Sequence, residues 1–288
     1  MTDVLEKHLK PFLRWAGGKS RLTKYIKKCI PKKYNNYWEP FLGSGALFFN
    51  ILPNKSYLSD LNSDLITCYK YVRDYPEQIF EQLQNHQVKN SEEYYYTIRD
   101  IYNNGTESIG QSARFIYLNK SSFNGIFRVN KLGKYNVPYG HKEPPSLPSK
   151  NNLIKISRAL SNTILFIDHY RSILKNVDLQ SQDFVYLDPP YPPTNVKTAN
   201  FTHYTSDRFT WYDQEELADI ANQLSQKGCS VMISNSDQEK IRSLFTNWNI
   251  ITLPVVRWVA ANGNRKKINE LIITNYDLEF QQIFKEGK

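Results

Sequence analysis

The sequence predicts an α/β protein with a doubly wound, mainly parallel sheet and an inserted helical domain that carries a β-hairpin. Strand-like and helix-like segments alternate near both ends of the 288-residue chain, whereas residues 76–120 read as successive helices. Such alternation is typical of a parallel sheet with helices on both faces. Acids and glycines follow several of the expected strands, which is where ligands bind in such sheets.

The expected elements of the sheet region form two groups, one on each side of the helical block. In the first group, a basic amphipathic helix follows a glycine pair, and two short strands are each followed by a helix. In the second group, strands and helices alternate again and the chain ends in a strand pair. The helices are expected at 20–30, 46–52, 62–73, 151–160 and 213–227, and the strands at 37–41, 55–59, 163–167, 183–187, 229–234, 250–256 and 268–275.

The middle of the chain has a different pattern. PEQIFEQLQNH, SEEYYYTIRDIY and GQSARFIYLNK read as three helices. Two β-rich pieces, IFRVN and KYNVPY, then flank KLG, which is a hairpin signal. We therefore expect a sheet domain formed by residues 1–70 and 150–288, and a separate domain at 71–149.

Charge is distributed unevenly along the chain. The formal net charge is +9, and residues 10–38 and 113–142 contain many Lys and Arg but no Asp or Glu. Both stretches also contain aromatic residues. Basic stretches of this composition favour a nucleic-acid partner, and the alternative is a pair of solvated surface segments.

The cysteines and the N-terminus indicate the kind of compartment. Cys29, Cys68 and Cys229 lack CxxC spacing, so they predict neither a disulfide framework nor a zinc site and fit a reducing environment. The first ten residues contain no apolar leader segment, and no apolar run is long enough to span a bilayer. We expect a soluble cytoplasmic protein without a bound metal or a membrane partner.

A glycine loop and an acid follow the first two expected strands. In EPFLGSGALF, Gly43 and Gly45 lie between a strand and a helix, where glycines allow a ligand to approach the backbone closely. Phe48 occupies the third glycine position of a dinucleotide fingerprint, which argues against a nicotinamide oxidoreductase. Asp60 ends the next strand and could hold ribose hydroxyls. The alternative for Asp60 is a helix N-cap.

The segment DPPY follows the apolar run FVYL. The amino group of a heterocycle is a poor nucleophile, because its lone pair is delocalised into the ring. The Asp188 carboxylate and a nearby carbonyl can accept its two N–H bonds, and Tyr191 offers a stacking face. Pro189 and Pro190 lack an N–H and have a fixed φ, so they hold the loop stiff. The alternative is a proline-terminated strand with a capping aspartate.

A third cluster is RWAGGK, in which Trp15 and Lys19 flank a glycine pair. An indole face and an ammonium one turn apart suit a ligand that combines an aromatic or cationic part with a carboxylate. The alternative is an ordinary helix start.

The motifs RWAGGK, EPFLGSGALF, LSDLNSDLI, FNGIFRVN, YNVPYG, DPPY and ISNSD occur in one order. This order resembles that of the Dam-like family of DNA adenine N6-methyltransferases, and the resemblance extends from about Lys10 to Asn275. It implies a Rossmann-like methyltransferase fold. In that family a target-recognition domain is inserted between the glycine loop and DPPY.

The resemblance implies S-adenosylmethionine (SAM) as the methyl donor and assigns nine residues to its site. Position by position, Trp15 and Lys19 would contact the cofactor, and Asp60 would hold its ribose. The FIDHY segment would border the adenine of the cofactor. The full set is Trp15, Lys19, Phe41, Gly43, Asp60, Asp168, His169, Tyr170 and Asp188.

The resemblance also implies that the hairpin enters the major groove of double-stranded DNA and that the FNG segment inserts an aromatic ring into the duplex. Phe123 stands where the family often has tyrosine, and intercalation needs only an aromatic face. Arg14 and Arg128 would read guanine, since a bidentate arginine–guanine pair provides roughly 1–3 kcal/mol of discrimination. A phosphate contact or a surface salt bridge is the alternative for both. The implied DNA-binding residues are Arg14, Phe123, Asn124, Ile126, Arg128 and Pro138.

The implied chemistry is methyl transfer to a flipped adenine, because a stacked base cannot be reached. Asp188 and the Pro189 carbonyl would accept hydrogen bonds from N6, and Tyr191 would stack on the base. Catalysis would then consist mostly of positioning and electrostatics. An ordinary carboxylate pKa of about 4 makes Asp188 a poor base before methyl transfer.

The sequence therefore predicts a SAM-dependent adenine N6-methyltransferase that acts at a GATC-type site. The alternatives are N4-cytosine, RNA or protein-amide methyl transfer, and a catalytically inactive DNA-binding regulator. Asp rather than Ser at position 188 and the FNGIFRVN insert favour adenine in duplex DNA. We expect a monomer on double-stranded DNA, and the resemblance leaves open a cognate restriction endonuclease in the same system.

Overall fold

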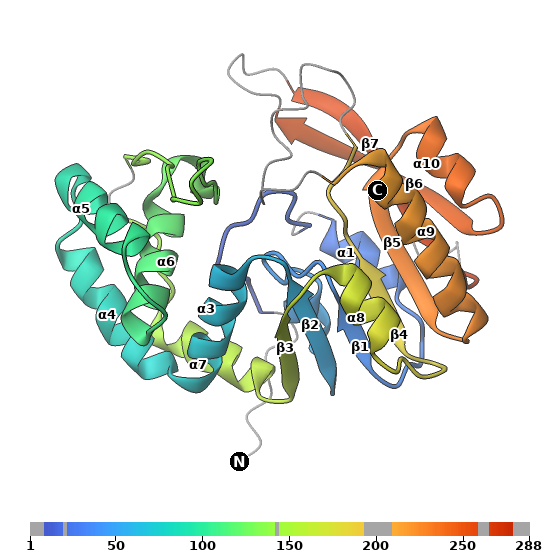
Figure 1. Ribbon diagram of the computed structural model, residues 1–288, viewed down its shortest axis with the longest axis horizontal. Helices are drawn as coiled ribbons and strands as arrows, with labels where there is room; N and C mark the ends of the chain where they lie inside the picture. Colours follow the sequence, from blue (N-terminus) through green and yellow to red (C-terminus); the bar gives the residue numbers. More distant parts are fainter. Residues whose placement is uncertain (1–8, 20–21, 142–143, 193–208, 259–264, 279–288) are drawn as a thin grey trace, which may run out of the picture.

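A seven-stranded sheet forms the centre of the protein (Figure 1). The computed structural model describes residues 9–19, 22–141, 144–192, 209–258 and 265–278, with positions 255–258 and 265–268 described by their backbone only. The strand order is β3-β2-β1-β4-β5-β7-β6, and β7 runs antiparallel to both of its neighbours. The strands are β1 (Tyr37–Glu39), β2 (Ser56–Asp60), β3 (Thr163–Ile167), β4 (Phe184–Leu187), β5 (Ser230–Ser236), β6 (Asn249–Trp258) and β7 (Arg265–Thr274).

Strand β4 shows why the sheet is covered on both faces. All four of its side chains are buried, and successive side chains of a strand point to opposite faces. Phe184 and Tyr186 belong to one apolar cluster, whereas Val185 and Leu187 belong to the other. A continuous apolar strand of this kind therefore requires a layer of helices on each side.

Each face of the sheet has its own helices. Helices α8 (Tyr170–Asn176), α9 (Trp211–Gln226) and α10 (Glu239–Leu244) contribute to the cluster that contains Val185. The cluster on the other face is built from α1 (Thr23–Ile26), the 3-10 helix η1 (Lys27–Cys29), α2 (Phe48–Ile51), α3 (Ser63–Asp74) and α7 (Lys150–Leu160).

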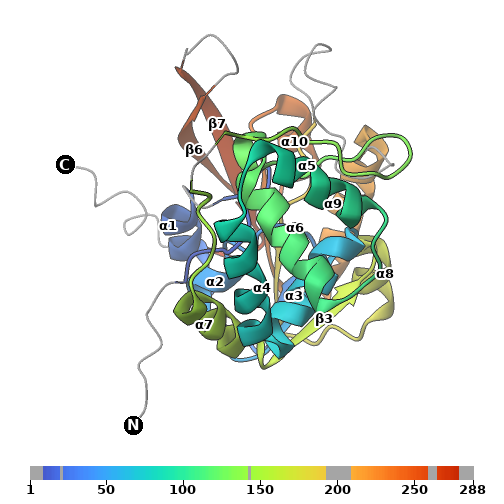
Figure 2. The same ribbon diagram turned by 90° about the vertical axis from the view of Figure 1, so that its left-hand side faces the viewer.

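Three further helices lie beside α3 and α7, on the left of Figure 1 and facing the viewer in Figure 2. They are α4 (Pro76–Val88), α5 (Glu92–Asn103) and α6 (Ile109–Ser121), and the 3-10 helix η2 (Phe123–Gly125) follows them. Ser91 and Ser108 begin α5 and α6, and each serine side chain accepts a backbone N–H in the first turn.

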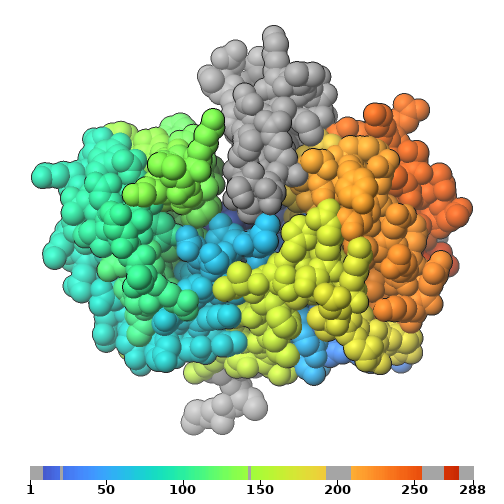
Figure 3. All heavy atoms as spheres, viewed as in Figure 1, coloured from blue at the N-terminus to red at the C-terminus, as the bar shows by residue number. Residues whose placement is uncertain are grey.

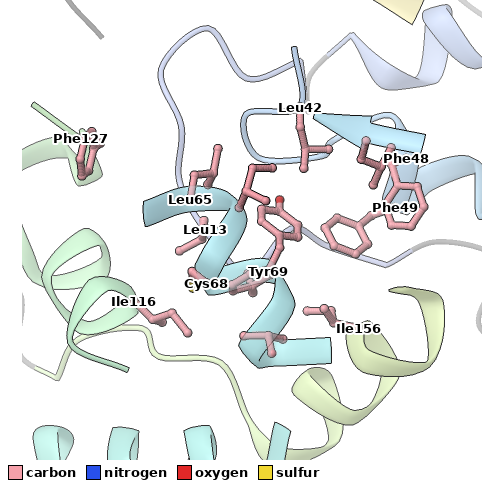
Figure 4. Close-up of a cluster of buried hydrophobic side chains, with 14 of the residues drawn as sticks. Leu13, Leu42, Phe48, Phe49, Leu65, Cys68, Tyr69, Ile116, Phe127 and Ile156 are labelled. Carbon is pink, nitrogen blue, oxygen red and sulfur yellow. The ribbon is translucent and has the colours of Figure 1, made fainter. Parts of the chain in front are cut away.

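The apolar core continues from the sheet into these helices. In Figure 4, Leu65 and Tyr69 on α3 lie between Phe48 and Phe49 of α2 on one side and Ile116 of α6 on the other. All five are buried in one cluster. In Figure 3, the described part of the α4–α6 segment and residues 211–250 lie on opposite sides of the molecule.

The expected strands and most of the expected helices are confirmed, with small shifts at their ends, and three expectations need correction. The helix expected at 20–30 is described as α1 and η1, over residues 23–29. Residues 20–21 lie outside the described part of the chain. Ile30 is extended, because a residue that precedes a proline avoids the helical region.

The second correction concerns α8 and α10, which were not expected. They contain seven and six residues, which is too short for a clear apolar periodicity.

The expected hairpin is the third correction, because its arms are not regular strands. They pair through the isolated antiparallel bridges Val129↔Tyr135 and Ser122↔Tyr139. The Asn130 side chain accepts the backbone N–H groups of Leu132 and Lys134 at 2.9 and 3.0 Å. Side-chain bonds of this kind compete with a strand ladder.

Candidate active site

A cavity of about 430 Å³ lies at the carboxyl ends of the parallel strands. The strand order reverses direction between β1 and β4, which is the position where doubly wound sheets bind ligands. The cavity brings together all nine residues expected at the cofactor and all four DPPY residues. The lining residues that the sequence analysis had expected at the site are Trp15, Lys19, Phe41, Gly43, Asp60, Asp168, His169, Tyr170, Asp188, Pro189, Pro190 and Tyr191.

The glycine loop joins the first two strand ends. Gly43 has a φ of +50°, and a Cβ on it would lie 2.9 Å from Cδ1 of Trp15. Its N–H donates to Oδ2 of Asp60 at 2.9 Å. The N-cap of α3 is Asn62, whose side chain accepts from Leu65 N. The structure therefore excludes the capping alternative for Asp60 and places its carboxylate in the cavity wall.

Burial raises the pKa of Asp60, and the backbone N–H groups of Asn62 and Gly43 oppose that shift. A carboxylate held in place by two backbone donors is well suited to accept hydrogen bonds from ligand hydroxyls.

Three aromatic rings form one wall of the cavity. The ring centroids of Phe41 and Tyr170 lie 5.0 Å apart, and Phe209 lies 6.0 Å from the first and 5.7 Å from the second. Beside them, Asp168 accepts the His169 N–H at 2.7 Å, and His169 is the N-cap of α8. Sequence reasoning missed Phe209 because it is separated from every motif.

An ion-pair cluster borders the same wall. Arg171 forms ion pairs with Asp213 and Glu216, and Arg171 and Asp213 line the cavity. Neither was expected from the sequence. Asp213 also closes a capping box with Thr210 at the start of α9. This capping pattern is the sequence signal from which Asp213 could have been selected.

An acid, an ammonium and an aromatic ring converge at the DPPY loop. Nζ of Lys19 lies 2.7 Å from Oδ1 of Asp188 and 4.5 Å from the centroid of the Tyr191 ring. Lys19 also donates to the Gly17 carbonyl at 2.8 Å. The hydroxyl of Tyr191 donates to Oε2 of Glu270 at 2.9 Å, and burial raises the Tyr191 pKa well above its ordinary value. Tyr191 is therefore neutral and anchored to β7.

Glu39 is a buried acid of the cavity wall that the sequence analysis did not select. It ends β1, is 3% exposed and accepts the Tyr37 hydroxyl at 2.8 Å. Burial raises the pKa of Glu39 to about 8, although the bond from Tyr37 opposes the shift. The sequence analysis missed Glu39 because the strand expected at 37–41 places it inside a strand, whereas β1 ends at Glu39 as β2 ends at Asp60.

Five of the six residues expected to bind DNA lie on one loop beside α6. Phe123 is 53% exposed, Asn124 has a φ of +57°, and the Phe123 N–H donates to the Pro138 carbonyl at 2.9 Å. Arg128 is exposed, and its guanidinium donates to Oδ1 and the carbonyl of Asn136 at 2.8 and 3.3 Å. Among the remaining residues of this set, Pro138 is exposed and Ile126 is half-buried.

Arg14 reaches this loop from the N-terminal segment. Asn119 on α6 is 1% exposed, and its side chain bonds both the N–H and the carbonyl of Arg14 at 2.8 Å. A Cβ on Gly125 would lie 2.3 Å from Cδ of Arg14. The next residue, Trp15, stacks on Phe127 with ring centroids 5.4 Å apart. The cavity wall and the loop are therefore in direct contact.

The strand order, the acids that end β1 and β2, and the DPPY loop after β4 define a Rossmann-like methyltransferase. The sequence model of the D12 class N6 adenine-specific DNA methyltransferase matches residues 15–258, and the chain belongs to this family.

Curated relatives match over nearly their full length. The type II methyltransferase M1.LlaDCHI of Lactococcus lactis is 40% identical over 95% of this chain and 99% of its own. The type II methyltransferase M.MjaIII of Methanocaldococcus jannaschii is 36% identical over 93% and 99%. The DNA adenine methylase of Escherichia coli is 34% identical over 91% and 93%. The expected family and the adenine-specific methyltransferase activity are thereby confirmed.

In the described part of the chain, none of the helices has the length and the apolar character needed to span a bilayer. Nor do its His, Cys, Asp and Glu residues form a group of three or more that could hold a metal ion.

Proposed function

We propose that this adenine-specific DNA methyltransferase binds SAM in the 430 Å³ cavity and methylates N6 of an adenine flipped out of double-stranded DNA. The observation that carries the proposal is the convergence of Asp188, Lys19 and Tyr191 beside a glycine loop. This convergence accounts for both SAM and adenine. The DPPY loop lines the cavity in which SAM would bind, and the acid and the ring of the loop suit an aromatic amine.

The residues of the cavity fit the proposed cofactor. Gly43 brings its backbone close to Trp15, where a side chain would collide. The Phe41–Tyr170–Phe209 wall offers apolar faces to an adenine ring, and the Asp60 carboxylate can accept bonds from ribose hydroxyls. When bound, SAM supplies an electrophilic methyl group.

The DPPY residues prepare the target amine. Asp188 and the carbonyl of Pro189 accept the two N–H bonds of the flipped adenine, which localises electron density on its nitrogen. Tyr191 stacks on the base, and its bond to Glu270 fixes the ring. Flipping costs a few kcal/mol, and fixed acceptors and a fixed stacking face offset part of that cost.

We propose that residues 71–149 recognise the DNA site. Phe123 is exposed and can enter the gap left by the flipped base. Arg128 and Arg14 would read guanine, while Asn124, Ile126 and Pro138 contact neighbouring bases of a GATC-type site. The relative from Lactococcus lactis is named a type II methyltransferase, and the relative from Escherichia coli is named a DNA adenine methylase. We propose a monomer in the cytoplasm with a cognate restriction endonuclease as partner.

The test is nucleoside analysis of duplex DNA treated with the purified protein and SAM, followed by mapping of the modified positions. We expect N6-methyladenine at one short site, and Asp188→Ala should abolish it while DNA binding remains. Full activity of Asp188→Ala would overturn the mechanism. N4-methylcytosine in place of N6-methyladenine, or modification of RNA alone, would overturn the proposed substrate.

A further inference from the structure

Two side-chain amides each donate to one carbonyl oxygen of the DPPYP segment, which spans residues 188–192. Its prolines have no N–H, so neighbouring backbone carbonyls receive no donor from them. The carbonyl of Pro190 accepts from Nε2 of Gln214 at 2.9 Å, and the carbonyl of Pro192 accepts from Nε2 of Gln238 at 2.9 Å. The loop is thus fixed by residues of α9 and of the segment after β5.

Gln214 belongs to a buried chain of amides with a defined direction. The Ser236 N–H donates to Oδ1 of Asn235 at 2.8 Å, so Nδ2 of Asn235 faces Gln214. Nδ2 donates to Oε1 of Gln214 at 3.0 Å, so Nε2 of Gln214 faces Pro190. A backbone N–H can only donate. The Ser236 N–H therefore determines the orientation of both amides. Asn235 is 1% exposed and Gln214 is 3% exposed.

We propose that Gln214 is a positioning residue for methyl transfer, an inference that rests on the proposed function. The rings fix φ of Pro189 and Pro190, and the bond from Gln214 removes most of the remaining rotation about ψ of Pro190. The Pro190 carbonyl is thereby committed to α9. Within the described residues, no side chain or backbone group donates to the Pro189 carbonyl, so that oxygen is the one presented to the target amine beside Asp188.

The bond also aligns the stacking ring. Tyr191 directly follows the carbonyl that Gln214 holds, and the Tyr191 hydroxyl is fixed at its far end by Glu270 at 2.9 Å. Gln214 and Glu270 therefore hold the two ends of Tyr191 from different elements, α9 and β7. Loss of either bond displaces the ring or the acceptor pair, and small displacements of this kind have large effects on rate.

The test compares Gln214→Leu and Gln214→Glu with matched variants of Gln223, which is exposed on the same helix. Gln214→Leu removes the donor, and we expect kcat to fall roughly 10- to 100-fold while KM for SAM stays within about twofold. Gln214→Glu still accepts from Asn235, but its carboxylate opposes the Pro190 carbonyl. Burial raises a carboxyl pKa. The protonated acid can donate, so activity relative to the parent should recover as the pH falls from about 8 to about 6.

Rates are expressed per folded enzyme, with the folded fraction measured by circular dichroism. The control variants Gln223→Leu and Gln223→Glu should retain the parent kcat at every pH. The proposal is overturned if the Gln214 variants retain the parent kcat and pH profile while Asp188→Ala is inactive. If Asp188→Ala is itself active, the proposed function fails instead. A uniform loss in Gln214→Glu at all pH values, with no recovery in acid, also overturns the positioning role.

Discussion

The ammonium of Lys19 lies 2.7 Å from Oδ1 of Asp188 and 4.5 Å from the centroid of the Tyr191 ring. The side chains of Lys19 and Asp188 are 6% and 17% exposed. The lysine therefore contacts the same carboxylate and the same ring that the proposed function assigns to the target amine.

Removal of one partner from the Lys19–Asp188 pair should destabilise the protein more than removal of both. Lys19→Met and Asp188→Asn should each lower the free energy of unfolding, by up to about 3 kcal/mol, because each leaves a buried charge without its counter-charge from the other side chain. The double variant should be less destabilised than either single variant, and therefore less than the sum of the two. Urea unfolding measures the coupling energy.

The exposed pair Lys150–Glu77, at 2.9 Å and 52% and 59% exposed, is the control for this cycle. We expect its coupling energy to be small, because solvent screens it. Additive effects at Lys19 and Asp188 would show that their close approach contributes nothing to stability.

Glu39 should make the stability of the protein depend on pH. Its ordinary pKa is 4.5 and burial raises the folded value to about 8. The folded protein therefore retains a proton that the unfolded chain has lost, and this stabilisation is complete below pH 4.5 and disappears as the pH rises through 8.

Glu39→Gln cannot lose this proton. Relative to the parent protein, the variant should gain roughly 2–4 kcal/mol of unfolding free energy between pH 5.5 and pH 8.5. Urea unfolding at about four pH values in this range provides the measurement. A difference between the two proteins that is the same at every pH would mean that Glu39 is ionised in the folded state throughout.

Gly43→Ala should weaken cofactor binding through its contact with Trp15. Gly43 has a φ of +50° and its Cβ would lie 2.9 Å from the indole, whereas Gly133 has a φ of +72° and open space around it. Alanine costs roughly 1–2 kcal/mol of backbone strain at either position. Only Gly43→Ala displaces Trp15, and we expect its Kd for SAM to rise at least about tenfold. Calorimetric titration of both variants separates strain from collision, and equal SAM affinities would contradict this role of Gly43.

The sequence predicted the cavity residues well for a geometric reason. Asp60, Asp168 and Asp188 lie far apart in the chain, but each ends or directly follows a parallel strand. The carboxyl ends of parallel strands meet at one edge of the sheet, so a residue at each end is brought to one site. The local pattern predicted Asp60 and Asp188, and the family resemblance added Asp168 by its position after a strand.

Other site residues depend on contacts that no local pattern encodes. Glu270 reaches Tyr191 from the antiparallel strand β7, and Gln214 reaches Pro190 from α9. Phe209 joins the aromatic wall without a motif around it. The arms of the hairpin also differ from the expected strands, because Asn130 bonds the local backbone in place of a ladder. These features are set by tertiary packing, which strand and helix propensities do not contain.

Arg128→Ala should relax the choice of DNA sequence more than it weakens binding to DNA in general. Asn136 holds the Arg128 guanidinium through two hydrogen bonds, and in the proposed function this guanidinium makes a bidentate contact with guanine. Loss of that contact should cost about 1–3 kcal/mol on the specific site and little on random duplex. The exposed Lys131 in the turn of the same hairpin is the control, and Lys131→Ala should weaken both complexes equally and reduce the salt slope by about one. Fluorescence anisotropy on specific and random duplexes, at several salt concentrations, measures both quantities. If Arg128→Ala behaves like Lys131→Ala, Arg128 contacts phosphate and does not read a base.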